Sequence, residues 1–239
     1  MSTIFKREAL ILAGGLGTRL RAVVSDRPKP LAEVRGRPFI ERLLAQLALF
    51  RYERAILCVG YRGAQVRETL GDRFGALTLS YSFEDYPLGT AGALRNALGM
   101  VEAPHILAMN GDSYCEIDYA GLAASHVRFG AAATIAVLRR EDCGGAGVVE
   151  LDADNRVVAF ASRPDRPGPG LINAGVYMFR KDALLAVPTG RAVSLEEETF
   201  PALAAKRTLF GWPITSDFID IGTPENYAGA PDFFADPQA

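Results

Sequence analysis

The alternation of short apolar runs with segments of helical periodicity across the first 130 residues most constrains the fold. Residues 9–13 and 55–59 are continuous apolar runs, which predict strands buried on both faces, as in a parallel sheet. Between them, residues 38–50 place apolar side chains on one helical face. The alternation continues with helices expected at 63–70, 90–100 and 122–129 and strands at 77–83 and 105–109. This order predicts an α/β fold with a Rossmann-like, doubly wound, mostly parallel sheet and helices on both faces.

The second half of the chain has a different pattern, in which strands follow one another with little helix between them. The expected strands are at 132–138, 147–151, 157–161, 172–179, 208–212 and 218–221. Residues 152–155 predict a hairpin turn, and helices are expected at 195–206 and from Pro224. We therefore expect a mixed sheet in which antiparallel additions form one wall of a cleft.

The length of 239 residues suits one α/β domain with a large core. No linker long enough to separate domains interrupts the sequence, so we expect a single domain over residues 1–239. A hexapeptide repeat, which marks a β-helix, is absent, and we expect no such C-terminal domain.

The composition argues against several classes of protein. The formal net charge is −2 and the basic residues are scattered, which disfavours nucleic-acid binding. No run approaches the roughly 18 apolar residues that span a bilayer, and no signal peptide is evident, so we expect a cytoplasmic protein without membrane contact. Cys58, Cys115 and Cys143 form no C-x-x-C pair, which predicts reduced thiols. With only two histidines, a His-built zinc site is disfavoured.

The loop after the first predicted strand has the features of a phosphate site. Gly14, Gly15 and Gly17 stand where a strand turns into a helix, so backbone N–H groups can approach a polyphosphate closely. Arg19 adds a cation with bidentate geometry, and Lys29 lies between two prolines that stiffen the chain around its ammonium group. A glycine-rich turn with a solvated arginine is the alternative, and the Pro-Lys-Pro segment weighs against it.

Two other phosphate motifs do not fit this loop. A P-loop needs Gly-Lys-Ser/Thr after its glycines, and here Thr18 is followed by Arg19. The dinucleotide motif G-x-G-x-x-G needs a third glycine where this chain has Leu20. A nicotinamide-dependent dehydrogenase is therefore disfavoured.

Two aspartates stand at predicted strand ends. Asp112 follows Asn110-Gly111 and Asp220 precedes Ile221-Gly222. Two such carboxylates can hold one Mg²⁺ and leave positions for phosphate oxygens and water. Aspartates at strand ends are also common as helix caps or turn residues, so the residues alone leave both interpretations open.

Taken together, the motifs resemble the sugar-1-phosphate nucleotidyltransferases, a family of the nucleotide-diphospho-sugar transferase fold. The resemblance rests on segments in the same order along nearly the whole chain: 12–20 (LAGGLGTRL), 28–30 (PKP), 87–93 (PLGTAGA), 110–112 (NGD), 147–150 (GVVE), 173–175 (NAG) and 220–224 (DIGTP). Within the family, it is greatest to the short guanylyltransferases that act on D-glycero-D-manno-heptose 1-phosphate. Mannose 1-phosphate guanylyltransferases, glucose 1-phosphate thymidylyltransferases and N-acetylmuramate 1-phosphate uridylyltransferases share most of the same residues.

The resemblance implies attack of a sugar 1-phosphate on the α-phosphate of a nucleoside triphosphate, expected to be GTP, with release of pyrophosphate. It implies Mg²⁺ on Asp112 and Asp220, and catalytic roles for these two residues with Arg19 and Lys29. Residues 1–130 are expected mainly to bind nucleotide and residues 131–239 mainly the sugar phosphate. The implied nucleotide contacts are Leu12, Ala13, Gly14, Gly15, Gly17, Thr18, Arg19, Lys29, Glu84, Gly89, Thr90 and Asp112.

The base and sugar contacts are less closely defined. Glu84 can accept hydrogen bonds from guanine, and Thr90 is expected to cap helix 90–100. For the sugar phosphate, the resemblance implies Gly147, Arg163 and Asn173. Many relatives have Glu-Lys-Pro where this chain has Ser162-Arg163-Pro164, so the carboxylate of that motif is replaced here by a hydroxyl.

A different class of protein also fits part of the pattern: a catalytically silent relative that binds nucleotide and regulates or scaffolds. The presence of both candidate cations and both candidate metal ligands argues against it. The expected partners are therefore GTP and a sugar 1-phosphate, and the chain is a candidate for a homo-oligomer.

Overall fold

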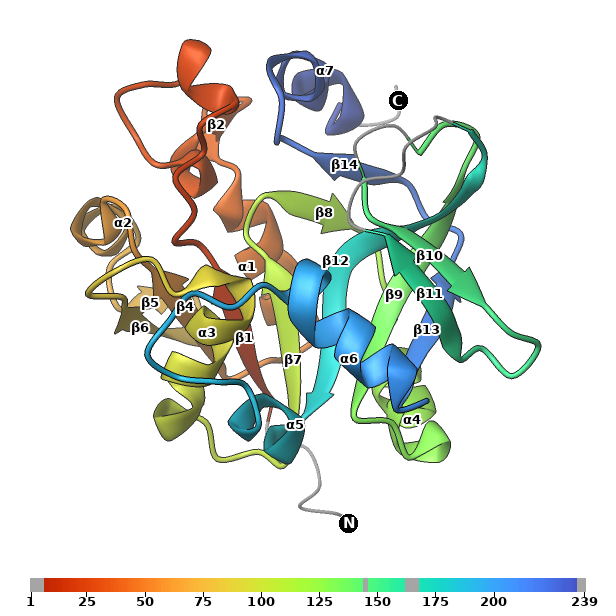
Figure 1. Ribbon diagram of the computed structural model, residues 1–239. Coiled ribbons are helices and arrows are strands. Elements are labelled where there is room, and N and C mark those ends of the chain that lie inside the picture. The colour runs from red at the N-terminus through yellow and green to blue at the C-terminus, as the bar shows by residue number, and fades with distance from the viewer. Residues whose placement is uncertain (1–6, 144–145, 162–167, 236–239) are drawn as a thin grey trace.

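The computed structural model describes residues 7–143, 146–161 and 168–235. Its first half forms the parallel part of a mixed sheet (Figure 1). Strand β1 (Glu8–Leu12) lies between β4 (Arg54–Val59) and β7 (His105–Asn110), and β6 (Leu77–Phe83) lies beyond β4. All these pairings are parallel, as predicted from the apolar runs. The chain adds β4 and β6 on one side of β1 and then returns to add β7 on the other side, so the strand order reverses between β1 and β7. Open α/β sheets bind their ligands at such a reversal, beyond the carboxyl ends of the strands.

The second half extends the same sheet with antiparallel strands. The long strand β12 (Gly170–Arg180) runs antiparallel to β7 and, on its other edge, to β9 (Ala133–Arg140). The remaining strands are β10 (Val148–Leu151), β11 (Val157–Ala161), β13 (Leu209–Ile214) and the edge strand β5 (Arg73–Phe74). The predicted hairpin turn joins β10 to β11, and the N–H groups of Asp154 and Arg156 both donate to the Asp152 carboxylate.

Helices cover both faces of the sheet because the strands of its first half are apolar on both sides. On β1, Ala9 and Ile11 face one core and Leu10 faces the other. The first core also contains residues of α1 (Ile40–Leu49), α2 (Gly63–Leu70) and α4 (Tyr119–Phe129). The second contains residues of α3 (Gly89–Asn96), α5 (Lys181–Leu185) and α6 (Phe200–Ala205), which lie in front of the sheet in Figure 1.

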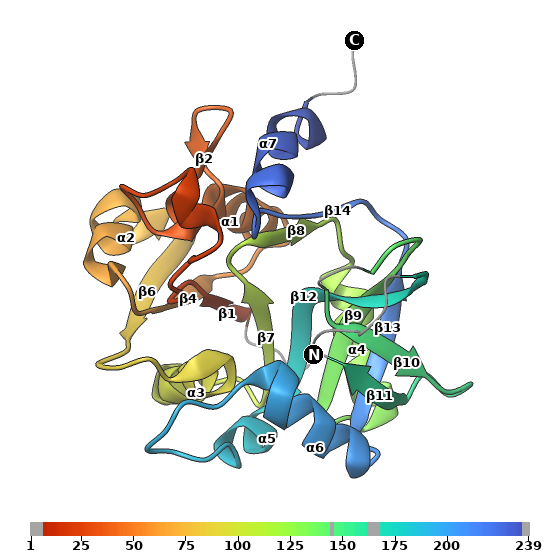
Figure 2. The same cartoon turned by 45° about the horizontal axis from the view of Figure 1, so that its top comes forward.

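A smaller unit lies over the carboxyl ends of the central strands (Figure 2). It contains a two-stranded sheet of β8 (Ser113–Cys115) and β14 (Phe218–Asp220), a second one of β2 (Glu33–Val34) and β3 (Arg37–Pro38), and helix α7 (Pro224–Phe233). A third apolar cluster, including Leu20, Phe39 and Ile221, holds these pieces together. This unit brings the end of the chain back to the loops that follow β1 and β7.

Local structure differs from the sequence-based expectations at three places. The glycine loop does not lead into an α-helix, because only a 3₁₀ turn (Leu20–Ala22) follows it. Thr90 does not cap α3: the helix begins at Gly89, and the Thr90 hydroxyl instead accepts a hydrogen bond from the Leu195 N–H at 2.8 Å. The segment expected as one helix at 195–206 is a π-helical turn (Leu195–Thr199) followed by α6. Further 3₁₀ turns occupy Lys29–Leu31 and Ala97–Met100. No helix in the described part of the chain is long and apolar enough to cross a membrane, and all three cysteines are free and buried.

Candidate active site

A cleft of about 1000 Å³ opens at the carboxyl ends of β1 and β7, where the strand order reverses. This volume is at the upper end of the range usual for small-molecule sites. Its β1 side is formed by the loops after β1, β4 and β6, and its β12 side by β12, the start of β10 and the π-helical turn. The β8–β14 sheet contributes the wall between them.

The β1 side is built by close approach of backbone to backbone. A Cβ atom added at Gly14 would lie 2.6 Å from the Glu84 Oε1 atom and 2.9 Å from the Gly60 nitrogen, so only glycine fits there. The neighbouring Gly15 has the opposite environment, since a Cβ there would meet nothing within 4 Å. Gly17 turns the loop with a φ of 60°, and its carbonyl accepts from the Leu20 N–H at 3.0 Å. The loop is therefore fixed from beneath and open toward the cleft.

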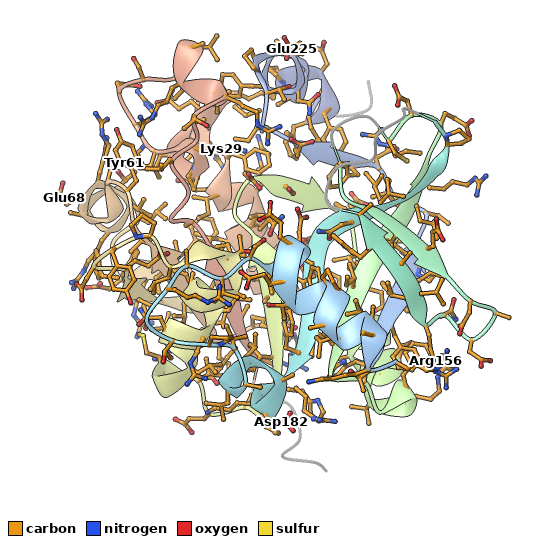
Figure 3. All side chains as sticks on the ribbon, viewed as in Figure 1. Lys29, Tyr61, Glu68, Arg156, Asp182 and Glu225 are labelled. Carbon is orange, nitrogen blue, oxygen red and sulfur yellow. The ribbon has the colours of Figure 1, made fainter. Side chains whose placement is uncertain are left out.

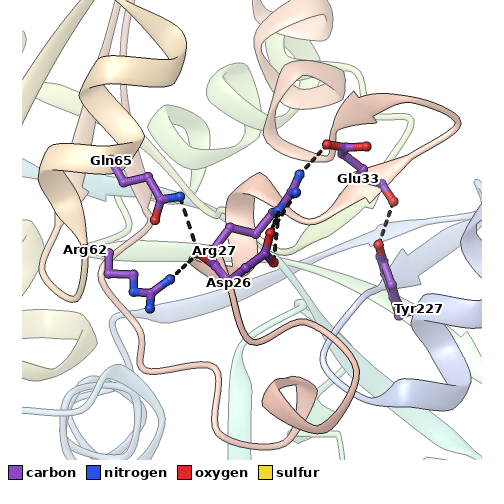
Figure 4. Close-up of polar contacts among 6 residues, drawn as sticks. All are labelled: Asp26, Arg27, Glu33, Arg62, Gln65 and Tyr227. Atoms are coloured by element: carbon purple, nitrogen blue, oxygen red, sulfur yellow. Dashed lines mark hydrogen bonds and ion pairs between the residues drawn. The ribbon is translucent and has the colours of Figure 1, made fainter.

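Lys29 reaches the cleft from a segment that we call the lysine strap, residues 26–33. Figure 4 shows how ionic and polar contacts hold this strap at both ends. At one end, the Gln65 amide of α2 donates to the Asp26 carbonyl at 3.5 Å, and Arg62 donates to the same oxygen. Along the strap, Arg27 pairs with the carboxylate of Asp26 at 2.8 Å and with that of Glu33.

At its other end, the strap is attached to α7, because the Tyr227 hydroxyl donates to the carbonyl of Glu33 at 2.7 Å. Proline on both sides of Lys29 limits the backbone between these contacts. Figure 3 shows Lys29 among the N-terminal loops and Tyr61 beside α2. The strap thus directs a single ammonium group into the cleft, with only 12% of the Lys29 side chain exposed.

The two aspartates predicted as a pair meet on the wall of the cleft. Strand β14 pairs with β8 so that Asp220 stands opposite Ser113, and the Ile221 N–H donates to the Asp112 carbonyl at 2.9 Å. They are therefore brought together by the small β8–β14 sheet, since only Asp112 follows a strand of the main sheet. Asp112 forms an ion pair with Lys29.

Both candidate cations lie close to Gly222, next to Asp112 and Asp220, which we call the acidic wall. A Cβ added there would lie 3.2 Å from the Lys29 Nζ atom and 3.6 Å from the Arg19 Nη2 atom. The same glycine donates its N–H to the Asp220 Oδ1 atom at 2.8 Å, and Asn226 donates to Oδ2 at 2.9 Å. Two carboxylates and two cations thus converge at one point of the cleft.

The Asp112 carboxylate is held in its ionised form. Burial alone would raise the pKa of Asp112, but the charge and hydrogen bond of Lys29, with a hydrogen bond from Ser113, outweigh it and bring the pKa below its usual value. Within the described ranges, no group of three or more His, Cys, Asp or Glu side chains lies close enough to hold a metal ion by itself. A pair of carboxylates is nevertheless a donor set that suits Mg²⁺, which binds few protein oxygens and completes its shell with water and phosphate.

The start of α3 closes the β1 side of the cleft. Gly89 has a φ of 72°, and a Cβ there would lie 2.5 Å from the Val193 carbonyl oxygen, so glycine is required on both counts. Glu84, in the preceding loop, accepts from the Leu88 N–H at 2.9 Å. Burial raises the pKa of Glu84 from its ordinary value, and the Leu88 hydrogen bond opposes this shift only in part.

The β12 side is built from side chains that hydrogen-bond to one another. Asn173 accepts from the Gly175 N–H at 2.9 Å and donates through Nδ2 to the Tyr177 hydroxyl at 3.0 Å and to Glu196 at 2.8 Å. The Tyr177 hydroxyl in turn donates to the Asn110 Oδ1 atom at 3.4 Å. In each asparagine the amide oxygen accepts, and in Asn173 the amide nitrogen donates, so these contacts fix the orientation of both amides.

Most residues predicted for the site do line the cleft: Leu12, Ala13, Gly14, Gly15, Arg19, Lys29, Glu84, Gly89, Thr90, Asp112, Gly147, Asn173 and Asp220. Gly17 and Thr18 do not line it, and Arg163, with Ser162 and Pro164, lies outside the described residues. Other residues that the sequence motifs did not indicate also line the cleft, among them Tyr61, Asn110, Arg140, Ser194, Glu196 and Asn226. Asn110 was detectable because it begins the Asn-Gly-Asp segment. Glu196 was not, because it stands in a run of three glutamates on an expected helix.

The chain is similar to known nucleotidyltransferases. The family model described as nucleotidyl transferase matches residues 8–236. A mannose-1-phosphate guanylyltransferase of Mycobacterium tuberculosis is 36% identical over 92% of this chain, which spans 62% of that protein's length. A D-glycero-alpha-D-manno-heptose 1-phosphate guanylyltransferase of Aneurinibacillus thermoaerophilus is 32% identical over 93% of this chain and 96% of its own. The crystal structure of HddC from Yersinia pseudotuberculosis complexed with GMP-PN has a TM-score of 0.84 and 32% identity, and the match covers 95% of this chain and 99% of that one.

Proposed function

Because the chain belongs to the nucleotidyl transferase family, we propose that it is a sugar-1-phosphate guanylyltransferase. It joins GTP to D-glycero-D-manno-heptose 1-phosphate and releases pyrophosphate, by analogy with relatives that match nearly the full length of this chain. The observation that carries the proposal is the convergence of Arg19, Lys29, Asp112 and Asp220 in one cleft beside the glycine loop.

The β1 side is the proposed nucleotide site. The open face at Gly15 admits a triphosphate to the backbone N–H groups of the loop, and Arg19 provides a bidentate cation at its end. Glu84 lies next to Gly14 and also lines the cleft, and its carboxylate can accept from both N1–H and N2–H of guanine. Since burial raises the pKa of Glu84, two donors from the base would stabilise the charged form, and a base without them would not.

The proposed reaction needs alignment and charge neutralisation more than proton transfer. The attacking oxygen belongs to a phosphate that is already an anion near neutral pH, so no general base is required. The bond that forms joins this oxygen to the α-phosphorus, and the bond that breaks releases pyrophosphate. We assign to Lys29 the neutralisation of charge at the α-phosphate and to Arg19 that of the leaving pyrophosphate, because both cations lie at the acidic wall.

The acidic wall fits a divalent cation, which we propose is Mg²⁺. Asp112 and Asp220 would hold it, since both carboxylates border the cleft next to the two cations. When bound, Mg²⁺ supplies neutralisation of phosphate charge as a Lewis acid. Lys29 forms an ion pair with Asp112. If Asp112 held a cation, the Lys29 ammonium group would leave this carboxylate and pair with a phosphate instead.

Mannose 1-phosphate is a second candidate acceptor, since a mannose-1-phosphate guanylyltransferase is 36% identical to this chain. The test is pyrophosphate release with Mg²⁺, using each of the four nucleoside triphosphates against hexose and heptose 1-phosphates. Turnover with GTP and the heptose phosphate supports the proposal, and turnover with another pair keeps the reaction class but replaces the substrate. Folded protein that binds nucleotide without releasing pyrophosphate would identify a silent relative.

We predict that Asp112→Asn lowers kcat by about 10²–10³-fold, because it removes one of the charged groups at the reacting phosphates. The measurement is steady-state pyrophosphate release with saturating GTP. Asp154→Asn is the control, because Asp154 lies in the β10–β11 turn, is 75% exposed and does not line the cleft. Equal rates for the two variants would remove Asp112 from the proposed mechanism.

A further inference from the structure

The π-helical turn that opens toward the cleft carries three consecutive glutamates with three different environments. The Thr199 N–H bonds to the Ser194 carbonyl at 3.1 Å, which is the wide i→i+5 pattern found frequently at functional sites. Glu197 is exposed, and Glu198 pairs with Arg191 at 2.6 Å on the outside of the turn. Glu196 alone of the three lines the cleft.

The position of Glu196 within the cleft is well defined. Its Oε1 atom accepts from the Asn173 Nδ2 atom at 2.8 Å, and Asn173 is itself fixed by the Gly175 N–H and the Tyr177 hydroxyl. A Cβ added at Gly147 would lie 3.3 Å from the same Glu196 oxygen, so the absence of a side chain there leaves room for the carboxylate. A negative charge is thereby held on the β12 side.

Glu196 lies on the β12 side, apart from the acidic wall where Arg19 and Lys29 meet Asp112 and Asp220. In the proposed reaction, the phosphate of the sugar 1-phosphate meets the α-phosphate of GTP at that wall. The rest of that substrate is a ring that carries hydroxyl donors, and it extends from the phosphate toward the β12 side. A carboxylate can accept about four hydrogen bonds, two of them bidentately from a pair of neighbouring hydroxyls.

We propose that Glu196 is a specificity-determining residue that accepts hydrogen bonds from ring hydroxyls of the sugar 1-phosphate. This inference rests on the proposed function, because it names the recognition of the second substrate of that same site. The substrate class it selects is a pyranose 1-phosphate with adjacent hydroxyls, and sugars with a hydroxyl removed at that place are rejected.

Glu196→Gln tests the acceptor role while preserving the structural contact. The glutamine Oε1 atom can still accept from Asn173, but its Nε2 atom donates and so cannot accept from a hydroxyl. Glu197→Gln is the matched control, because it makes the same chemical change one residue further on, at an exposed position outside the cleft.

The experiment measures kcat and KM of the wild type and both variants with the acceptor that the wild type uses best and with its singly deoxygenated analogues. For Glu196→Gln we expect kcat/KM for the sugar phosphate to fall about 10–100-fold, as for loss of a hydrogen bond to a charged group. KM for GTP should stay within about twofold, since Glu196 lies on the β12 side. The variant should also lose most of the wild-type preference for the intact sugar over one deoxy analogue.

Two results overturn the inference. One is that Glu196→Gln matches Glu197→Gln with every substrate. The other is that Glu196→Gln impairs GTP and sugar phosphate equally with a lowered melting temperature and unchanged discrimination, which identifies a purely structural residue. Failure of the proposed function is a separate observation: the wild type then releases no pyrophosphate with any sugar 1-phosphate, and the inference about Glu196 falls with it.

Discussion

The two sides of the cleft are built by different means. On the β1 side, glycines allow backbone segments to touch: a Cβ at Gly14, Gly89 or Gly111 would lie 2.5–2.9 Å from a backbone atom of another segment. On the β12 side, the surface consists of side chains, with Asn173 linking Tyr177 to Glu196. Substitutions at close-packed glycines displace the backbone, whereas a side chain on the β12 side can be substituted without moving the backbone. We therefore propose that the β1 side binds the triphosphate and that the β12 side binds the more variable sugar.

The largest effect on stability is expected for a substitution in the glycine loop on the β1 side. Gly14→Ala should destabilise the protein by about 1–3 kcal/mol, because the added methyl group overlaps the Gly60 backbone and the Glu84 carboxylate. Gly15→Ala should leave stability unchanged and weaken binding of a GTP analogue, because its methyl group points into the open cleft. Urea unfolding and calorimetric titration measure the two quantities.

The glycine pair can also contradict this account. If Gly14→Ala were as stable as Gly15→Ala, the loop would be free to move away from Gly60, and close packing would not define the β1 side. If Gly15→Ala bound the GTP analogue as the wild type does, the triphosphate would lie elsewhere in the cleft.

An intermediate effect is expected from Tyr177→Phe on the β12 side. The change removes the hydroxyl that accepts from Asn173 and donates to Asn110, both inside the buried network. We expect a loss of about 1–2 kcal/mol in the free energy of unfolding, with a several-fold higher KM for the sugar phosphate and an unchanged KM for GTP. Tyr81→Phe, which removes a hydroxyl that donates to the Gly71 carbonyl outside the cleft, is the control. A matching rise in KM for GTP would show that the two sides are not independent.

The smallest effect on stability is expected from the lysine strap, where the β1 side depends on ionic side chains. Arg27→Met breaks the pairs with Asp26 and Glu33, and partly exposed pairs of this kind contribute roughly 0–1 kcal/mol each. Because the strap directs Lys29, we expect kcat to fall a few-fold while the melting temperature barely changes. Arg156→Met removes a comparable exposed pair with Asp154, far from the cleft, and should leave kcat unchanged. Equal kcat values in the two variants would show that the Arg27 ion pairs do not position Lys29.

Local sequence predicted most of the fold because its signals are local. The apolar runs predicted the parallel strands, and the glycine loop and the Asn-Gly-Asp segment border the cleft that we propose as the active site. Thr90 was misassigned because its hydroxyl is used by Leu195, a residue 105 positions away. The π-helical turn was missed because its pattern of glutamates is also that of a solvated α-helix face.

The sequence by itself determined the fold class, the glycine-rich loop after the first strand and the residue types of the acidic wall, since periodicity and glycine requirements act between neighbours in the chain. Only the tertiary structure decided which distant residues meet. The pairing of β14 with β8 joins Asp220 to Asp112, and the π-helical turn directs Glu196, but not Glu197 or Glu198, toward Asn173. Such contacts depend on packing between segments about 20–110 residues apart, and no local pattern of apolar or charged residues encodes their geometry.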